Sequence, residues 1–248
     1  MTERLRLRRR WTRGTIRYVP AAVLLFALAL LIGVSGLFRV TDVKVSGEAM
    51  YTEGQVTDAS GVKRGDSMLL FRSKKAGARI REKLAYVSDV KIDVMYPSTV
   101  GIRLSESTAA ASIMSGGSYW IIDADGRILE ETSLEGAAGT ILVTGISIFE
   151  PTVGEKIKTD NETRMNYMTE LLRAFQSRDI QDKVTELTMN SIANISFDYE
   201  GRFTVNYGDG AGGTAKLDRL IEVIGRLDED DAGTLEVAAD GSIHYIPV

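Results

Sequence analysis

The residue pattern with the most obvious chemistry is a glycine-rich segment at residues 208–213, in which Gly208, Gly210 and Gly213 have the spacing G-x-G-x-x-G. In a dinucleotide-binding fold such glycines let the backbone approach a pyrophosphate, and an acid about twenty residues later, here Glu236, binds the ribose. The preceding strand alternates apolar and polar residues, however, whereas a parallel strand of that fold reads as continuously apolar. Only 35 residues follow Gly213, too few for the rest of such a sheet. We therefore interpret the segment as a connecting loop.

Other candidate residues are also better explained by structure than by chemistry. Asp123 and Asp125 resemble the start of a calcium loop, but the closing position of that loop is Leu134 instead of a glutamate, so a hairpin turn is expected. His244 is the only histidine and cysteine is absent, which excludes a multi-histidine metal site and a cysteine nucleophile. The sequence therefore predicts no catalytic site, no cofactor, no metal and no small-molecule substrate.

The first structural element predicted along the chain is residues 18–38, a run of 21 uncharged residues. At a rise of about 1.5 Å per residue, a helix of this length spans a hydrocarbon core of about 30 Å. Residues 1–17 contain seven arginines and one glutamate, so the positive-inside bias predicts a cytoplasmic tail and an extracytoplasmic remainder. A cleaved secretory signal is the alternative, although its apolar region is usually shorter. We expect an uncleaved single-pass anchor.

The charge of the chain is divided between the two sides of this segment. The 30 basic and 34 acidic residues give a net charge of −4, but beyond residue 38 there are 23 basic and 33 acidic residues, a net charge of −10. Such a body is not expected to bind nucleic acid through its phosphates. The acidic run at 228–231 is interpreted as a solvated loop, with contact to a cation or a basic partner as the alternative. Without cysteine, the domains must be stable without disulfides.

The first region beyond the predicted anchor, residues 39–107, has the order strand, helix, helix, strand, strand. Thr52 and Gln55 have the spacing of a capping box, which predicts a short helix that Gly61 ends. Residues 76–86 carry apolar side chains at helical spacing and predict a second, amphipathic helix. Two alternating segments joined by a proline turn then predict a hairpin.

Three phrases in this region are specific: Phe38 to Gly47, Gly65 to Phe71, and Val87 to Glu106 with an aromatic residue before Pro97. A fourth, Tyr119 to Gly126, contains the pattern Asp-x-x-Gly. In these phrases the chain resembles the FtsQ/DivIB family of bitopic bacterial cell-division proteins. The resemblance implies a membrane anchor, a polypeptide-transport-associated (POTRA) domain and a second, mostly β domain. Tyr96 stands where the family more often has tryptophan.

The second half of the chain, residues 108–248, is predicted to be rich in strands and to contain two helices. The fold class expected for the whole chain is α+β: a transmembrane helix, a small βααββ POTRA domain, and a larger mixed or antiparallel sheet domain with two helices. The expected strands are 118–123, 127–131, 140–143, 184–189, 192–199, 202–207, 234–238 and 242–246, and the expected helices are 160–177 and 215–227.

The last strand is the best candidate for a binding surface. A strand at the edge of a sheet has unpaired N–H and C=O groups that can pair with another chain. Ile243 and Tyr245 lie on one face of this strand, and His244 and Ile246 on the other. The strand contains neither lysine nor an interior proline, so its edge is either covered by the chain itself or used for binding.

The resemblance implies that the edge is used. In FtsQ/DivIB proteins the last strands and the preceding helix bind a small coiled-coil partner of the FtsB/DivIC type, which associates with FtsL. The implied partner-binding residues are Ile243, His244, Tyr245 and Ile246 on the strand and Arg219, Glu222 and Arg226 on the exposed side of the helix. The implied function is a non-enzymatic scaffold for septal peptidoglycan synthesis, in the bacterial cell membrane at the division septum. Two other classes stay open, a membrane-anchored extracytoplasmic enzyme and a POTRA-type transport or chaperone protein.

Overall fold

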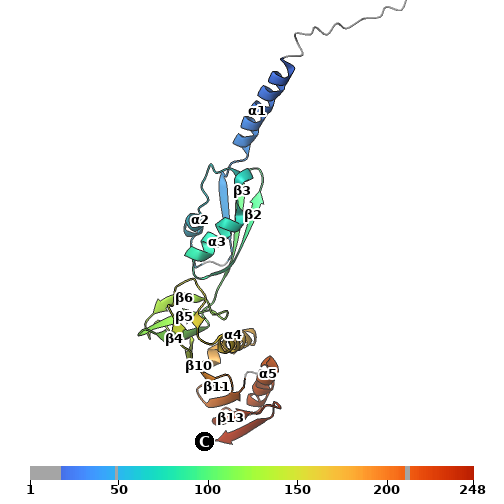
Figure 1. The fold of residues 1–248 in the computed structure, drawn as a ribbon. Helices are drawn as coiled ribbons and strands as arrows, with labels where there is room; N and C mark the ends of the chain where they lie inside the picture. The colour runs from blue at the N-terminus through green and yellow to red at the C-terminus, as the bar shows by residue number, and fades with distance from the viewer. Residues whose placement is uncertain (1–17, 48–49, 210–212) are drawn as a thin grey trace, which may run out of the picture.

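The computed structural model describes residues 18–47, 50–209 and 213–248. The predicted basic tail, residues 1–17, lies outside this range. The chain forms one helix followed by two units that succeed one another along an extended molecule (Figure 1). We call the part from β1 to β3 the first unit and the part from β4 to β14 the second unit.

Helix α1 (Val19–Leu37) occupies most of the predicted anchor. Apolar side chains on it, such as Val23, Leu24 and Phe26, are exposed. Over the residues that the structure describes, no helix combines the length and the apolarity needed to cross a membrane.

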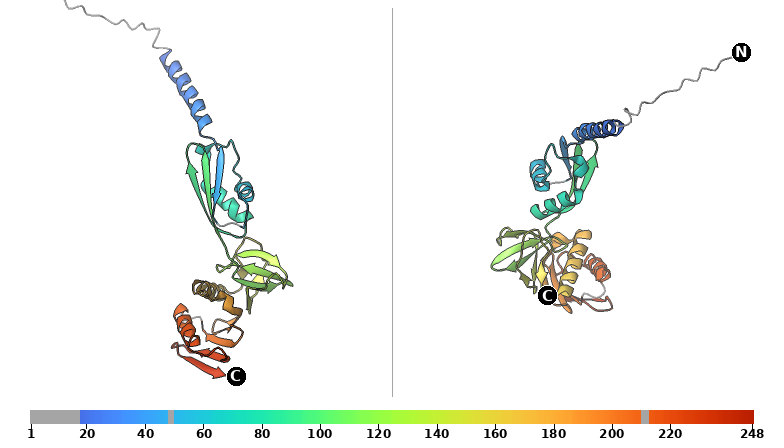
Figure 2. Two further views of the ribbon diagram at one scale, coloured as in Figure 1. Left: turned by 180° about the vertical axis from the view of Figure 1, so that it is seen from behind. Right: turned by 45° about the horizontal axis from the view of Figure 1, so that its top comes forward.

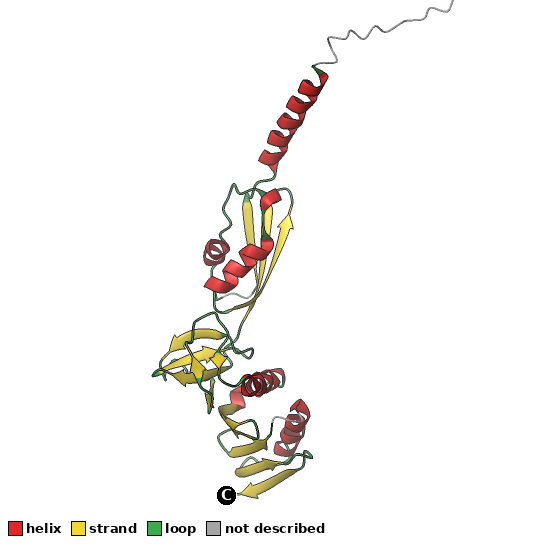
Figure 3. Ribbon diagram, viewed as in Figure 1, coloured by secondary structure: helices red, strands yellow, loops and turns green. Residues whose placement is uncertain are grey.

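The first unit is a sheet of three strands in the order β1-β3-β2, with its helices on one face (Figure 3). β1 runs parallel to β3, and β2 and β3 form the predicted antiparallel hairpin. Its core contains Val56, Ile80, Val87 and Ile102, all fully buried. The elements are β1 (Asp42–Ser46), α2 (Glu53–Ser60), η2 (Met68–Leu70), α3 (Ser73–Lys83), β2 (Val87–Met95) and β3 (Thr99–Glu106).

The predicted capping box at the start of α2 is confirmed. The Thr52 hydroxyl accepts a hydrogen bond from the Gln55 N–H, and the Gln55 side chain accepts one from the Thr52 N–H at 2.8 Å. Gly61 ends the helix at φ 71°, a left-handed conformation that glycine adopts without steric cost. The second predicted helix is three residues too long at its C-terminal end, because α3 ends at Lys83 and Val87, which fits the helical spacing, begins β2.

The second unit is one mixed sheet of nine strands in the order β14-β13-β12-β11-β10-β7-β4-β5-β6. Two short strands, β8 and β9, pair separately. The elements are β4 (Ala111–Ser115), β5 (Ser118–Ile122), β6 (Ile128–Thr132), β7 (Ile141–Thr144), β8 (Ile148–Phe149), β9 (Lys158–Thr159), α4 (Glu162–Ser177), η3 (Gln181–Lys183), β10 (Val184–Ser191), β11 (Asn194–Tyr199), β12 (Phe203–Gly208), α5 (Gly213–Ile224), β13 (Gly233–Val237) and β14 (Ile243–Pro247).

Helices α4 and α5 lie side by side against one face of this sheet (Figure 2). Phe203, Val205 and Tyr207 of β12 are buried on that face, while Thr204 and Asn206 on the other face are exposed. β12 nevertheless runs parallel to β13, with α5 as the crossover between them. The alternation of β12 therefore reflects a sheet that is covered on one face only, unlike the parallel strands of a dinucleotide-binding fold, which are buried on both faces. Gly210 to Gly212 of the glycine motif lie outside the described residues.

The two units are joined through the turn between β5 and β6. Oδ1 of Asp123 accepts hydrogen bonds from the backbone N–H groups of Asp125 and Arg127, both at 2.9 Å, which confirms the predicted hairpin turn. Oδ2 of Asp123 accepts a hydrogen bond from the Ser107 hydroxyl at 3.0 Å. The Arg127 guanidinium then donates to the carbonyl oxygens of Arg81 and of Val87, the latter at 3.3 Å. Since Arg81 and Val87 belong to the first unit, one side chain ties both units together.

Candidate protein-interaction edge

Strand β14 forms one edge of the nine-stranded sheet, with β13 as its single neighbour among the described strands. The pair is antiparallel, with Leu235 opposite Tyr245 and Val237 opposite Ile243. At one end of the pair the Ala238 N–H donates to the Ser242 carbonyl at 2.9 Å. Hydrogen-bonded positions alternate in an antiparallel ladder, so His244 and Ile246 face β13 with their backbone groups. The backbone N–H and C=O of Ile243 and Tyr245 then point away from the sheet.

The inner face of β14 is fixed to the core by Tyr245. Its ring packs edge-on against Phe203 with the centroids 6.1 Å apart, and its hydroxyl donates to the Ala232 carbonyl at 3.0 Å. Ile243 packs against the same core. On the outer face His244 and Ile246 are exposed, with 49% of Ile246 accessible. The strand is therefore held in place from one side and leaves its edge and its outer face accessible.

Gly233, at the start of β13, allows β14 to come close. Its φ is +151°, and a β-carbon built there would lie 2.2 Å from the carbonyl oxygen of Ile246. Any side chain would therefore push β14 away from β13.

The turn between β13 and β14 is closed by Asp240. Its carboxylate accepts hydrogen bonds from the backbone N–H and the hydroxyl of Ser242, at 2.9 and 2.7 Å. The bond from the Ser242 N–H holds the pKa of Asp240 below its ordinary value. The turn gives β14 a fixed starting point.

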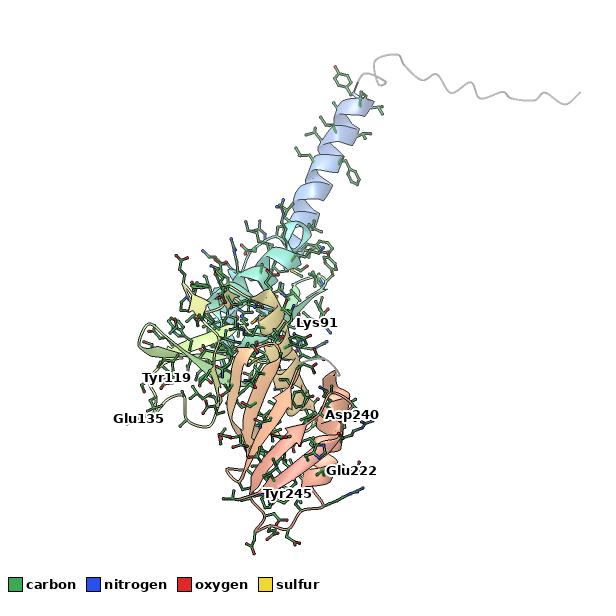
Figure 4. The ribbon with its side chains drawn as sticks, turned by 60° about the horizontal axis from the view of Figure 1, so that its bottom comes forward. Lys91, Tyr119, Glu135, Glu222, Asp240 and Tyr245 are labelled. Carbon is green, nitrogen blue, oxygen red and sulfur yellow. The ribbon has the colours of Figure 1, made fainter. Side chains whose placement is uncertain are left out.

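Helix α5 carries the other predicted site residues, Arg219, Glu222 and Arg226, and all three are exposed. Arg219 donates to the Asp240 carbonyl at 3.1 Å, which ties α5 to the turn before β14. Glu222 and Arg226 pair with each other, one helical turn apart. Figure 4 shows Glu222, Asp240 and Tyr245 gathered at the C-terminal end of the second unit. The structure thus brings Arg219 to the strand's turn, but it gives Glu222 and Arg226 no hydrogen bond or ion pair to β14 within the described residues.

Sequence reasoning missed Arg202, which supports this end of the sheet from β12. Its Nη1 donates to the carbonyl oxygens of Asp228, Glu229 and Asp231 at 2.8 to 3.3 Å. Its guanidinium also lies 4.6 Å from the centre of the Phe203 ring. The acidic run was interpreted as a solvated loop, and these contacts fix its backbone just before β13. No sequence signal marks this role, because the partners are carbonyl groups of a distant loop.

The enzyme hypothesis requires titratable side chains that converge in a hollow. A hollow of about 670 Å³ lies between α4 and residues 156–159, and an ion pair of 2.6 Å between Arg173 and Asp125 crosses its lining. Among the described residues no group of three or more histidine, aspartate or glutamate side chains is arranged to hold a metal ion. Lys216, at the glycine motif, is buried and bonded to the Asp209 carboxylate at 2.7 Å. That carboxylate would repel a pyrophosphate.

Comparison with known proteins connects this fold to bacterial cell division. Residues 38–107 match the family model described as "POTRA domain, FtsQ-type". The chain is 29% identical over 123 residues to a cell division protein FtsQ of Streptomyces bingchenggensis, an alignment that covers 50% of this chain and 46% of the relative. It is 25% identical over 161 residues to a cell division protein DivIB of Clostridium acetobutylicum, covering 64% of this chain and 62% of the relative. The chain is therefore similar to the FtsQ/DivIB cell-division proteins, most specifically in its POTRA domain.

The extent of these matches differs along the chain. The alignments to the two relatives named above span less than two thirds of each relative's length. A DivIB of Clostridium botulinum aligns more fully, with 21% identity over 212 residues that cover 84% of this chain and 82% of the relative. The POTRA domain is therefore the part with a specific family signature, and the predicted α+β fold with a POTRA domain and a large sheet is confirmed.

Proposed function

We propose that this protein is a non-enzymatic scaffold of the bacterial division machinery. In this proposal it binds FtsB/DivIC-like and FtsL-like proteins outside the membrane and so coordinates septal peptidoglycan synthesis. The observation that carries the proposal is the edge of β14, where the N–H groups of Ile243 and Tyr245 point away from the sheet. A partner segment in extended conformation adds to this edge as a further strand.

The chemistry of the edge favours strand addition. The outward groups of β14 are two N–H donors, at Ile243 and Tyr245, and three carbonyl acceptors, which include that of Pro247. Because Pro247 has no N–H, the ladder loses its donor only at the last position of the strand. The exposed Ile246 and His244 offer side-chain contacts on the outer face, and Arg219, Glu222 and Arg226 extend the surface along α5.

The charge of the second unit indicates the kind of partner segment. Residues 108–248 contain 11 basic and 24 acidic residues, a net charge of −13. Glu236 lies opposite His244 on the outer face, and the acidic run 228–231 precedes β13. A partner strand that carries lysine or arginine therefore complements the negative charge around this edge.

In the same proposal residues 18–38 are a single-pass type II anchor and residues 1–17 a cytoplasmic tail. Residues 39–107 and 108–248 are then the extracytoplasmic POTRA and β-rich domains, at the division septum of the cell membrane. The supporting observation is the uncharged run of 21 residues behind seven arginines. An enzyme would instead need titratable side chains that converge in a hollow. A transport or chaperone protein would need further POTRA repeats or a barrel.

The test uses residues 38–248, which contain both hydrophobic cores, and the extracytoplasmic segment of an FtsB/DivIC-like partner. Tyr245→Pro removes the ring and an outward N–H, whereas Tyr245→Ala removes the ring and keeps the N–H. The difference between the two variants in partner binding, measured by calorimetry, isolates the edge donor. We expect Tyr245→Pro to bind at least tenfold more weakly than Tyr245→Ala, about 1.4 kcal/mol. Equal affinities of the two folded variants would move the site away from β14, and no binding by the unmodified protein would reopen the enzyme and transport hypotheses.

A further inference from the structure

The end of the POTRA domain next to α1 exposes large apolar side chains. Leu69 and Leu70 are 56% and 80% accessible, and Tyr96 is 60% accessible. The Met68 N–H donates to the Phe38 carbonyl at 2.9 Å, and the rings of Phe38 and Tyr96 meet edge-on with centroids 5.7 Å apart. Because Phe38 directly follows α1, these exposed side chains are held beside the exit of that helix.

Five basic residues lie close in sequence to Leu69 and Leu70. The cations Lys63, Arg64, Arg72, Lys74 and Lys75 are all exposed, and within the part of the chain that the structure describes no ion pair is formed by any of them. The nearest acid in sequence, Asp66, accepts a hydrogen bond from the Lys63 backbone N–H at 2.9 Å. This end therefore has an excess of positive charge at its surface.

The excess is specific to this part of the molecule. Residues 39–107 contain 12 basic and 9 acidic residues, a net charge of +3, against −13 for residues 108–248. A hollow of about 330 Å³ opens beside Leu70, and Arg72, Lys75 and Arg79 line it together with Asp66. Three cations and one carboxylate around a shallow hollow suit a singly charged phosphate group.

We propose that this end of the POTRA domain rests on an anionic phospholipid surface. Leu69, Leu70 and Tyr96 then enter the headgroup region, and the neighbouring lysines and arginines bind lipid phosphates. Exposed apolar side chains beside basic ones, with an aromatic residue at the interface, are the composition that binds such surfaces. We assign a membrane to this surface because Met68, next to Leu69 and Leu70, is hydrogen-bonded to Phe38 directly after α1. Helix α1 leaves the domain at this end (Figure 1). The inference deepens the proposed anchoring and goes beyond partner binding, because it sets the orientation of the domain on the bilayer.

The first test needs no anchor. Residues 38–248 are sedimented with vesicles of phosphatidylcholine alone and of phosphatidylcholine with phosphatidylglycerol. Binding is expected only to the anionic vesicles and is expected to weaken with salt. Replacing Lys63, Arg72 and Lys75 by glutamine should lower the partition coefficient about a hundredfold, at about fivefold for each cation. The matched control replaces Lys44, Lys83 and Lys91, which are exposed on the same domain and do not line the hollow beside Leu70, and should lower the partition coefficient far less.

The second test uses the full chain in lipid nanodiscs. Because the protein has no cysteine, Leu70→Cys and Leu134→Cys each give a single site for a spin label, and both positions are exposed. Accessibility to dissolved oxygen and to a water-soluble nickel complex then reports the depth of the label. We expect the label at position 70 to lie at headgroup depth and the label at position 134 to lie in water.

The outcomes separate this inference from the anchoring proposal. If the chain stays in the nanodisc but both labels lie in water, the lipid face is wrong and the anchor stands. If the chain does not enter nanodiscs, the anchor is wrong, and the vesicle experiment alone decides the lipid face. Equal loss of vesicle binding in the test and control triple variants would show a diffuse charge effect and would also overturn the proposed face.

Discussion

The turn that joins the two units gives the sharpest prediction of stability. Asp123 is 7% exposed and accepts three hydrogen bonds, two from backbone N–H groups and one from the Ser107 hydroxyl. Asp123→Ala leaves these donors without their acceptor, at a cost of about 1 to 3 kcal/mol for each buried group. Water reaches part of the turn, so we expect a total loss of about 3 to 5 kcal/mol in the free energy of unfolding.

A control lies two residues away. Asp125 is exposed and forms an ion pair with Arg173, so Asp125→Ala should cost about 0 to 1 kcal/mol. Asp123→Asn keeps one carbonyl acceptor for the two N–H groups and should fall between the alanine variants. Urea unfolding of residues 38–248 is followed by the fluorescence of Trp120 on β5, which is the only tryptophan in that fragment. If Asp123→Ala and Asp125→Ala lower the unfolding midpoint equally, the reasoning about the turn is wrong.

Three further predictions follow from named contacts. Arg127→Ala should raise the radius of gyration in small-angle scattering and speed proteolysis near residue 108. Arg127→Lys should not restore the contact between the two units, because a single ammonium cannot replace the two donors of the guanidinium. The hydrogen bond from Lys183 lowers the pKa of Glu200 below its ordinary value of 4.5. The ionised Glu200 therefore stabilises the fold above pH 4.5, and this stabilisation is lost as the pH falls through the lowered pKa. Wild type and Glu200→Gln should differ in urea stability at neutral pH and converge in acid. Burial raises the pKa of Tyr207 from 10.0 to about 12. The neutral phenol therefore stabilises the fold fully below pH 10, and this stabilisation is lost as the pH rises toward 12. Tyr207→Phe should lose less stability in alkali than wild type.

The parts of the fold that could be predicted from sequence are those fixed by neighbouring residues. The capping box of Thr52 and Gln55 and the turn at Asp123 to Gly126 are local hydrogen-bond patterns, and the structure has both. Helix α4 follows from its periodicity, and the side chain of Asn161 caps it by accepting a hydrogen bond from the Arg164 N–H. These signals lie within a few residues of one another, so the sequence contains all the information that they need.

The features that sequence missed depend on distant pairing. Strand β4 was not predicted, although its residues 111–113 are buried, because it is short and is specified by its neighbours β5 and β7. The parallel arrangement of β12 and β13 was not predicted either, because it also depends on the pairing of strands that are distant in sequence. At the candidate site the sequence indicated the strand and its two faces. Which backbone groups of β14 face outward depends on the pairing of Ala238 with Ser242, and no pattern within the strand reveals that pairing.

The two proposed surfaces lie at opposite ends of the molecule. The cationic end of the POTRA domain adjoins α1, while β14 and the acidic residues near it lie at the far end of the second unit (Figure 1). Between them Arg127 ties the β5–β6 turn of one unit to the carbonyl groups of the other. If lipid contact fixes the orientation of the first unit, this tie carries the orientation to the strand edge. Arg127→Ala should then leave the affinity for a free partner segment unchanged and weaken capture of a partner that is anchored in the same membrane, because such a partner meets the edge only at the height at which the junction holds it.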